Sequence, residues 1–488
     1  MHEDFERCVR AVQAKDDRFD GWFFTAVLTT RIYCRASCPV VPPKPENMSF
    51  YPSAAAAQEA GFRACKRCRP DASPGSPQWN ERADLVARAM RLIADGVVDT
   101  GGVSGLAARL GYSVRQVERH VRAELGAGPL SLARAQRAQT ARLLIETTGL
   151  SMIDVALAAG FGSVRTFNDT VREVFALSPT ELRARVRTAP ATAPGTLNLR
   201  LPYRKPLFPD NLFGHLVATG IPGVEEWRDG AYRRTLRLPH GPAVVALKPE
   251  DGYIGCRLTL SDLRDLSTAI SRCRRLLDLD ADPVAVDDAL AADRLLGPLV
   301  ATAPGRRVPR TVDGEEFAVR AVLGQQVSTA AARTHAARLV LAHGEPVEDA
   351  EGGSLTHVFP DAAALAEIDP ESLAMPQSRK RTLLGLVAEL NNGGLDLGAG
   401  SDWQQARERL HALPGFGPWT VESIAMRSLG DPDAFLPTDL GVKVAAKGLG
   451  LGQAAFVAHA ERWRPWRAYA VQHLWATGDH PINRLPAA

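Results

Sequence analysis

Four of the seven cysteines form two close pairs near the amino terminus, and this spacing limits the possible folds of the first block more than any other feature. Three residues separate Cys34 from Cys38, two separate Cys65 from Cys68, and 26 residues lie between the pairs. Four thiolates at such spacing suit the tetrahedral coordination of Zn²⁺. A block of about 70 residues also needs such a staple, because it buries too little apolar surface by itself. We therefore expect one zinc ion bound by these four cysteines, and the spacing alone leaves open whether the ion is purely structural.

The rest of the composition is that of a globular chain of 488 residues, long enough for about three domains. No run approaches the roughly 20 apolar residues that cross a bilayer. The first residues, MHEDFERCVR, lack the apolar segment of a secretory signal. We expect a cytoplasmic protein without a membrane partner, in which the isolated Cys8, Cys256 and Cys273 are inert core thiols. The first 190 residues are net basic and the remainder is slightly acidic, which is compatible with nucleic-acid binding at the front.

Two stretches rich in Pro, Ala, Ser, Gly and Thr, at 70–78 and 188–196, are typical of linkers. They divide the chain into three blocks, and the third changes along its length from strand-like to helical patterns. We predict a multidomain protein that is mainly α with α+β parts. Its expected domains are a small zinc-stapled α/β domain at 1–75, a tandem helix-turn-helix domain at 80–187, an α+β sheet subdomain at 197–280 and an all-α domain at 281–488.

The second block contains the same helical pattern twice. In the first copy, apolar residues recur at helical spacing up to Leu110, Gly111 breaks the helix, and Ser113 is placed to cap the next one. In the second copy, the break falls at 160–163, and Phe167 begins the next apolar stripe. Two helix-turn-helix units are therefore predicted, and a tandem pair is a stronger signal than a single copy, which any tight αα corner produces.

The third block opens with strand-like alternation and continues with helices. Small or polar residues alternate there with four apolar ones, Ile254, Cys256, Leu258 and Leu260. Asp262 follows and is predicted to cap a helix. Further on, the sequence LPGFGPWT at 413–420 predicts a hairpin, in which Gly415 and Gly417 allow a tight turn whose N–H groups can face a DNA phosphate. Asp439 follows this hairpin, and by itself such an aspartate is usually a helix N-cap.

The residues around the four cysteines show a family resemblance. The runs FFTAVLTTRIYCRASC at 23–38 and ENMSFYPSAAAAQEAGFRACKRCRPD at 46–71 closely resemble the N-terminal domain of the adaptive-response (Ada-type) DNA methyl-phosphotriester repair proteins. The resemblance implies that Cys34, held as a thiolate by zinc, irreversibly accepts a methyl group from a methylated DNA phosphate. Four basic residues, Arg63, Lys66, Arg67 and Arg69, crowd this site, and Arg63 and Arg67 are expected to contact DNA. We hypothesise that methylation, which lowers the negative charge of the site, tightens DNA binding and acts as a switch.

A second resemblance concerns the tandem helix-turn-helix block. The spacing of its two units and the segment GFGSVRTFNDTVREVFALSPTELRAR at 160–185 resemble the arabinose-regulator (AraC) family of transcription factors. This implies that 80–187 binds promoter DNA, regulates transcription and has RNA polymerase as a candidate partner. The recognition-helix residues expected to face the major groove are Arg115, Gln116, Arg119, Arg165, Thr166 and Asn168. For any one of them, a solvated helix face is the alternative.

Four segments of the third block carry a further resemblance. They are AVLGQQVS at 321–328, LPGFGPWT at 413–420, FLPTD at 435–439 and RPWRAYAVQHLW at 464–475. Together they resemble DNA-3-methyladenine glycosylase II, of the helix-hairpin-helix glycosylase superfamily. The resemblance extends over residues 197–488 and implies an all-α helix-hairpin-helix glycosylase domain behind the sheet subdomain.

This resemblance implies excision of N-alkylated purines such as 3-methyladenine from double-stranded DNA. Asp439 would be the catalytic carboxylate, which stabilises an oxocarbenium-like sugar and helps water to attack it. An N-alkylated purine already carries positive charge, so the base leaves without a general acid. Trp419 and Trp475 are expected to stack on the flipped base, with core packing as the alternative for each. Gln326 stands where the family has a wedging leucine.

Departures from the family pattern limit the chemistry. Trp419 replaces the lysine of bifunctional glycosylase/lyases, so we expect no Schiff-base strand cleavage and an abasic product. No cysteine follows Cys273, which excludes the iron–sulfur cluster of some relatives, and no organic cofactor is expected. Ser423 stands in place of the pocket tyrosine. The Pro-Cys-His-Arg motif of the second Ada methyl acceptor is absent, so O6-methylguanine repair is not expected.

These observations predict a DNA-acting fusion of a zinc methyl acceptor and alkylation sensor, an AraC-type DNA-binding domain and a monofunctional alkylbase glycosylase. Three alternatives stay open. The chain could be a transcription regulator whose glycosylase block only binds DNA, or a glycosylase for oxidised or deaminated bases. The cysteine site could also be structural alone.

Overall fold

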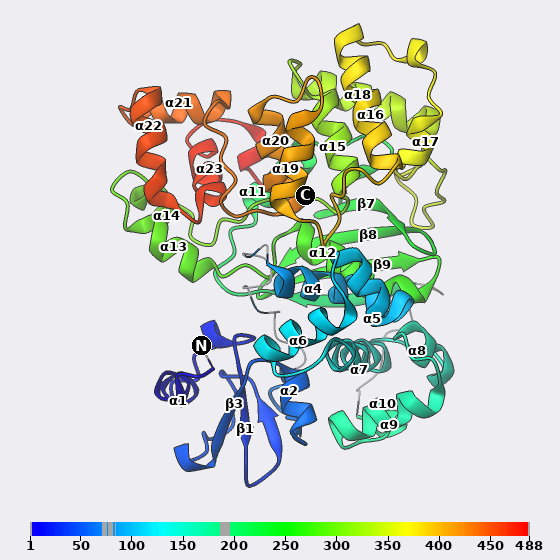
Figure 1. The fold of residues 1–488 in the computed structure, drawn as a ribbon, viewed down its shortest axis with the longest axis vertical. Coiled ribbons are helices and arrows are strands. Elements are labelled where there is room, and N and C mark those ends of the chain that lie inside the picture. Colours follow the sequence, from blue (N-terminus) through cyan, green and yellow to red (C-terminus); the bar gives the residue numbers. More distant parts are fainter. Residues whose placement is uncertain (1, 71–75, 77–81, 83, 186–195, 487–488) are drawn as a thin grey trace. The chain divides into compact units, whose positions relative to one another are not determined.

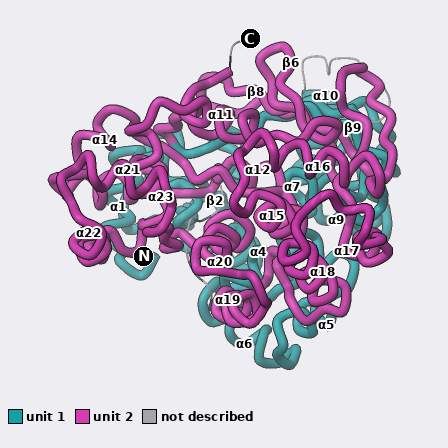
Figure 2. The backbone as a smooth tube through the Cα atoms, turned by 90° about the horizontal axis from the view of Figure 1, so that it is seen from above, with its two compact units in different colours: residues 1–204, 238–241, 257–271 teal, residues 205–237, 242–256, 272–488 magenta. Residues whose placement is uncertain are grey.

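The structure, a computed structural model, describes residues 2–70, 76, 82, 84–185 and 196–486. The chain forms two compact units (Figure 2). One comprises residues 1–204, 238–241 and 257–271, and the other comprises residues 205–237, 242–256 and 272–488. The predicted linkers at 70–78 and 188–196 lie mostly outside the described residues. None of the described helices combines the length and apolar character that crossing a membrane requires.

The first block folds around a four-stranded sheet in the order β3-β1-β2-β4 (Figure 1). Its elements are α1 (Phe5–Gln13), β1 (Phe24–Val27), β2 (Ile32–Cys34), β3 (Met48–Tyr51), α2 (Ala54–Glu59) and β4 (Arg63–Ala64). β1 pairs antiparallel with β2 and β3, whereas β2 runs parallel to β4 with Tyr33 opposite Ala64. Cys34 follows Tyr33 and Cys65 follows Ala64, so this parallel register places the two cysteines side by side. The sheet thereby joins two cysteine pairs that are distant in the sequence.

The second block is helical, as predicted. Its helices are α4 (Leu85–Ala94), α5 (Val97–Leu110), α6 (Val114–Leu125), α7 (Pro129–Thr147), α8 (Met152–Ala158), α9 (Val164–Phe175) and α10 (Pro179–Ala184). Ser113 caps α6 as predicted, because its side chain accepts from the Gln116 N–H while the Gln116 side chain accepts in return. The buried face of α6 contains Val117 and Val121, and that of α9 begins with Phe167. The pairs α5–α6 and α8–α9 form the two helix-turn-helix units.

A five-stranded sheet opens the third block, in the order β5-β9-β8-β7-β6. Its elements are β5 (Thr196–Pro202), α11 (Asp210–Ala218), β6 (Glu225–Arg228), β7 (Ala231–Leu238), β8 (Gly241–Glu250), β9 (Tyr253–Leu260) and α12 (Leu266–Leu276). The predicted alternation holds in β9, where Ile254, Cys256, Leu258 and Leu260 are buried. Asp262 caps a short 3₁₀ turn (Leu263–Asp265), and α12 follows that turn.

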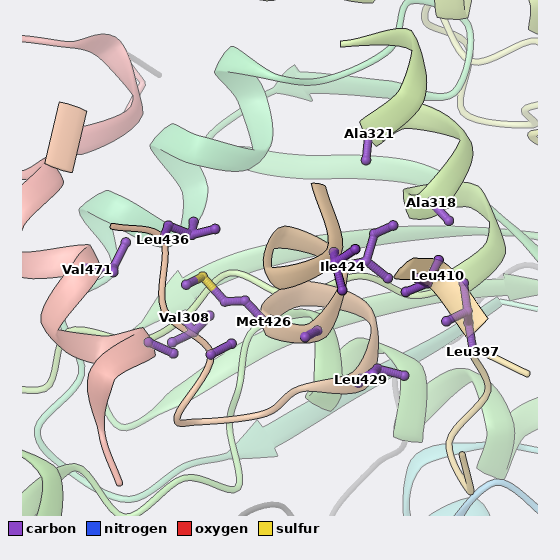
Figure 3. Packing of buried hydrophobic residues seen from close by; sticks show 14 of the residues in the cluster. Val308, Ala318, Ala321, Leu397, Leu410, Ile424, Met426, Leu429, Leu436 and Val471 are labelled. Atoms are coloured by element: carbon purple, nitrogen blue, oxygen red, sulfur yellow. The ribbon is translucent and has the colours of Figure 1, made fainter. Parts of the chain in front are cut away.

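The rest of the chain is helical and surrounds one large apolar core. The helices are α13 (Pro283–Ala291), α14 (Gly297–Thr302), α15 (Gly314–Leu323), α16 (Thr329–His343), α17 (Ala362–Ala366), α18 (Gln377–Asn391), α19 (Trp403–Ala412), α20 (Pro418–Ile424), α21 (Leu440–Gly448), α22 (Gln453–Ala460) and α23 (Arg467–Trp475). Figure 3 shows Ala318 of α15, Leu410 of α19, Ile424 of α20 and Val471 of α23 within this core. Burial of these apolar side chains stabilises the scaffold that positions the loops between α15 and α16, before α20 and before α21.

Candidate catalytic carboxylate and four-cysteine centre

Asp439 stands at the start of α21, and both of its carboxylate oxygens accept hydrogen bonds. As the helix N-cap, its Oδ1 accepts from the backbone N–H of Val442 at 3.1 Å. The indole Nε1 of Trp475 donates to the same oxygen at 2.8 Å, and the indole Nε1 of Trp419 donates to Oδ2 at 3.0 Å. A carboxylate offers about four lone-pair sites, so these contacts leave one, on Oδ2. The half-buried group is thus fixed in orientation but can still face a ligand.

The two tryptophans reach Asp439 from different elements. Trp419 is near the start of α20, and Trp475 is the last residue of α23. Both are partly buried against the apolar core, and both direct their N–H groups to the carboxylate. Both residues are predicted from the sequence as part of one site, but as rings that stack on the base and not as groups that orient Asp439. Their stacking on a flipped base stays a prediction.

His215 also belongs to the surroundings of this site, although no pattern in the sequence predicts it. Its ring stacks on Trp475 with the ring centroids 6.1 Å apart and an interplanar angle of 28°. Arg427 donates to His215 Nε2 and also to the Pro309 carbonyl, the latter at 2.8 Å. Burial, with the nearby Arg427 charge, lowers the pKa of His215 well below its usual value, so the imidazole is neutral. No local signal marks His215, because it lies 260 positions from Trp475 in the sequence.

The predicted hairpin forms between α19 and α20. Gly415 has φ +88°, and a Cβ there would lie 2.0 Å from Thr382 Oγ1, so only glycine fits this turn. Gly417 is the N-cap of α20, and a Cβ at this position would have no heavy atom within 4 Å. The backbone is therefore open on that side. Gln326 lies in the loop between α15 and α16, exposed, with φ +55°. Ser423 is buried on α20, four residues after Trp419.

The four cysteines of the predicted zinc site come together. Their sulfur atoms all lie within 4.8 Å of one another, and Cys38, Cys65 and Cys68 are buried whereas Cys34 is only half-buried. Four thiols in one compact group match the donor set of a tetrahedral zinc site. Cys34 is thus the ligand most open to a reactant.

The basic side chains near this cluster differ in their availability. Arg67 is exposed and Arg63, on β4, is half-buried. Arg69, directly after the last cysteine, pairs instead with Glu146 at the end of α7. Glu146 also accepts from Arg142 at 2.8 Å. Arg69 is therefore engaged within the protein, whereas Arg63 and Arg67 stay predicted DNA contacts.

The predicted recognition-helix residues lie at the starts of α6 and α9. Arg115, Gln116, Arg119, Arg165 and Thr166 are exposed and Asn168 is half-exposed. Two of them also serve helix caps. Gln116 Oε1 accepts from the Ser113 hydroxyl at 2.7 Å, and the Thr166 hydroxyl lies 2.9 Å from that of Ser163. Base contact by any of the six stays a prediction.

Comparison with known proteins finds matches to three parts of the chain. Family models match at 7–71 (metal binding domain of Ada), 106–185 (helix-turn-helix domain) and 198–313 (AlkA N-terminal domain). A Mycobacterium tuberculosis protein named "Probable bifunctional transcriptional activator/DNA repair enzyme AlkA" is 64% identical over 100% of this chain and 99% of its own length.

Relatives of the separate parts are also found. DNA-3-methyladenine glycosylase 2 of Escherichia coli is 34% identical over 58% of this chain and 96% of its own length. The bifunctional transcriptional activator/DNA repair enzyme Ada of Escherichia coli is 32% identical over 36% of this chain and 48% of its own length. A 3-methyladenine DNA-glycosylase structure from Archaeoglobus fulgidus shares the fold, with a TM-score of 0.50 at 19% identity over 57% of this chain and 97% of its own. The chain belongs to the family of AlkA-type bifunctional transcriptional activator/DNA repair enzymes.

Proposed function

We propose that this protein excises N-alkylated purines such as 3-methyladenine from double-stranded DNA, with Asp439 as the catalytic carboxylate. The observation that supports this most is the fixed carboxylate, which two indole N–H groups and a backbone N–H hold in one orientation. A negative charge held in place stabilises positive charge on a nearby deoxyribose without having to reorganise during the reaction. The named activities of the family members at 64% and 34% identity point the same way.

The proposed reaction needs no second carboxylate. The bond between the sugar and the base breaks with its electron pair moving to the cationic purine, which leaves as a neutral base. Asp439 stabilises the resulting oxocarbenium-like sugar, and its remaining lone-pair site on Oδ2 is available to accept a proton from the attacking water. Trp419 occupies the position of the lyase lysine, so the proposed product is an abasic site in an intact strand.

The replacement Asp439→Asn tests this proposal. Asparagine caps helices about as well as aspartate, so α21 should be retained while the negative charge is lost. We expect release of 3-methyladenine from alkylated duplex DNA to fall by about 100-fold or more. Asp402→Asn is the matched control, because Asp402 caps α19 by the same kind of contact, to Gln404 and Gln405. Unchanged base release by the Asp439 variant would leave only a DNA-binding role for this block.

We also propose that Cys34 accepts a methyl group from a DNA methyl phosphotriester. Its exposure relative to the three buried cysteines supports this choice. A bound zinc ion would keep the sulfur as a thiolate at neutral pH. Cys34 Sγ would bond to the methyl carbon as the carbon–oxygen bond breaks, and the electron pair would stay on the phosphate as a diester anion. Mass spectrometry of the Cys34 peptide after incubation with methylated DNA should show one added methyl, and its absence there would leave a structural site.

The helix-turn-helix block is proposed to bind promoter DNA and to activate transcription in the cytoplasm, with RNA polymerase as the partner. One zinc ion is the only cofactor in this proposal. Methylation of Cys34 would reduce the negative charge that opposes DNA phosphates and so tighten binding. Promoter affinity measured before and after methylation, over a series of salt concentrations, tests the switch. Equal affinities in the two states would contradict it.

A further inference from the structure

The loop that bears Gln326 is tied to the hairpin by the preceding residue. Gln325 Nε2 donates to the Gly415 carbonyl at 3.1 Å and to the Thr420 hydroxyl at 3.2 Å. One carboxamide thus bridges the turn of the hairpin and the first turn of α20. Gln325 and Gly415 lie 90 positions apart in the sequence.

A third element, α18, holds the same two segments. Arg379 donates to the backbone carbonyl of Gln325, and the Thr382 hydroxyl donates to the Pro414 carbonyl at 3.1 Å. Thr382 also fills the space beside Gly415 where a Cβ would be. Loop, hairpin and helix are therefore linked by several hydrogen bonds, and the position of the loop is fixed relative to the hairpin.

The conformation of Gln326 shows why the loop needs such support. Its φ of +55° lies in the left-handed region, which a side chain other than glycine occupies at a cost. Such a conformation persists only where neighbouring contacts enforce it. The hydrogen bonds from Gln325 and Arg379 fall on the residue directly before Gln326, while Gln326 itself is exposed. The loop is thus held in a shape that presents this side chain to solvent.

We propose that Gln325 is a positioning residue. It couples binding of the lesion strand by the hairpin to insertion of Gln326 into the gap left by the flipped base. This inference rests on the proposed glycosylase function. A hairpin bound to a phosphate near the lesion would set the place of the Gln326 side chain through the Gln325 carboxamide. Base flipping, rather than bond cleavage, would then be the step that depends on Gln325.

Gln325→Met tests the coupling, because methionine keeps the length of the side chain and removes its donor. On a duplex with an N-alkylated purine opposite its normal partner, we expect base release about tenfold slower than in the unchanged protein. On a duplex with the same lesion opposite an abasic site, where flipping breaks no base pair, we expect a change within about twofold. Gln404→Met is the matched control, since Gln404 makes a comparable hydrogen bond, at 2.8 Å, to Glu408 on α19.

A second measurement reports flipping without excision. In the Asp439→Asn background, fluorescence of 2-aminopurine placed beside the lesion should rise on binding, and Gln325→Met should reduce that rise. Equal losses on both duplexes, or no loss on either, would overturn the coupling. If the unchanged protein releases no base from either duplex, the proposed glycosylase function fails, and the fluorescence signal still decides the role of Gln325.

Discussion

Replacing Trp475 by phenylalanine removes one N–H from the Asp439 carboxylate and keeps an aromatic ring. The lost hydrogen bond spans 2.8 Å and joins a neutral donor to a charged acceptor. Bonds of this type contribute about 1.5–3 kcal/mol, and the half-buried position of the carboxylate favours the lower end. Because about 1.4 kcal/mol corresponds to a factor of ten in rate, we expect the bond-breaking step to slow about tenfold. Trp419→Phe removes the contact to Oδ2 and should have an effect of similar size.

A single-turnover assay isolates this effect. With protein in excess over a duplex that contains one N-alkylated purine, the rate constant of base release should fall while the protein concentration for half-saturation stays nearly constant. Trp403→Phe is the control for a general loss of packing, because Trp403 is buried in the same apolar core and the hydrogen bonds to the carboxylate come from Trp419, Val442 and Trp475. Wild-type rate constants in both the Trp475 and Trp419 variants would refute the idea that the indole N–H groups orient Asp439. If the rate constant is unchanged and only the protein concentration for half-saturation rises, the rings stack on the base instead.

Two further predictions concern stability. Burial lowers the pKa of His473 to about 3, whereas the unfolded chain keeps a pKa near 6.5. The unfolded state therefore binds more protons below about pH 6.5. As the pH falls there, His473 alone should lower the free energy of unfolding by up to about 1.4 kcal/mol per pH unit. Denaturant unfolding at about pH 7.5 and about pH 5.5 measures this, and His473→Leu should weaken the dependence. Removal of zinc by a chelator should unfold the first block, seen as loss of protection of β1 and β2 in hydrogen exchange. Base release should continue, because Asp439 belongs to the other compact unit.

Features with a local cause could be predicted from the sequence. The close spacing within each cysteine pair, the cap at Ser113 and the alternation in β9 each involve residues within a few positions of one another, and the structure agrees with all three. The family resemblance added Asp439 and the two tryptophans. It did not give their geometry, because the direction of an indole N–H depends on how α20 and α23 pack.

Contacts between distant segments could not be predicted in this way. His215 reaches Trp475, and Gln325 reaches Gly415, only because α11, α15 and the hairpin share one folded unit. Neither residue lies in a pattern of hydrophobic spacing or charge that would single it out. Arg69 gives the opposite case, since its position beside Cys68 suggests a DNA contact, yet it pairs with Glu146 on another helix.

The geometry of Asp439 leaves room for the proposed catalytic role beside its capping role. The cap uses Oδ1, which accepts from the Val442 N–H, and Trp475 donates to that same oxygen. Oδ2 accepts only from Trp419 among the described residues. The helix therefore anchors one side of the group and leaves the other side with a free lone-pair site. An aspartate at a helix start is common. The N-caps of α17 and α19 also accept from backbone N–H groups, and the two indole contacts distinguish Asp439 from them.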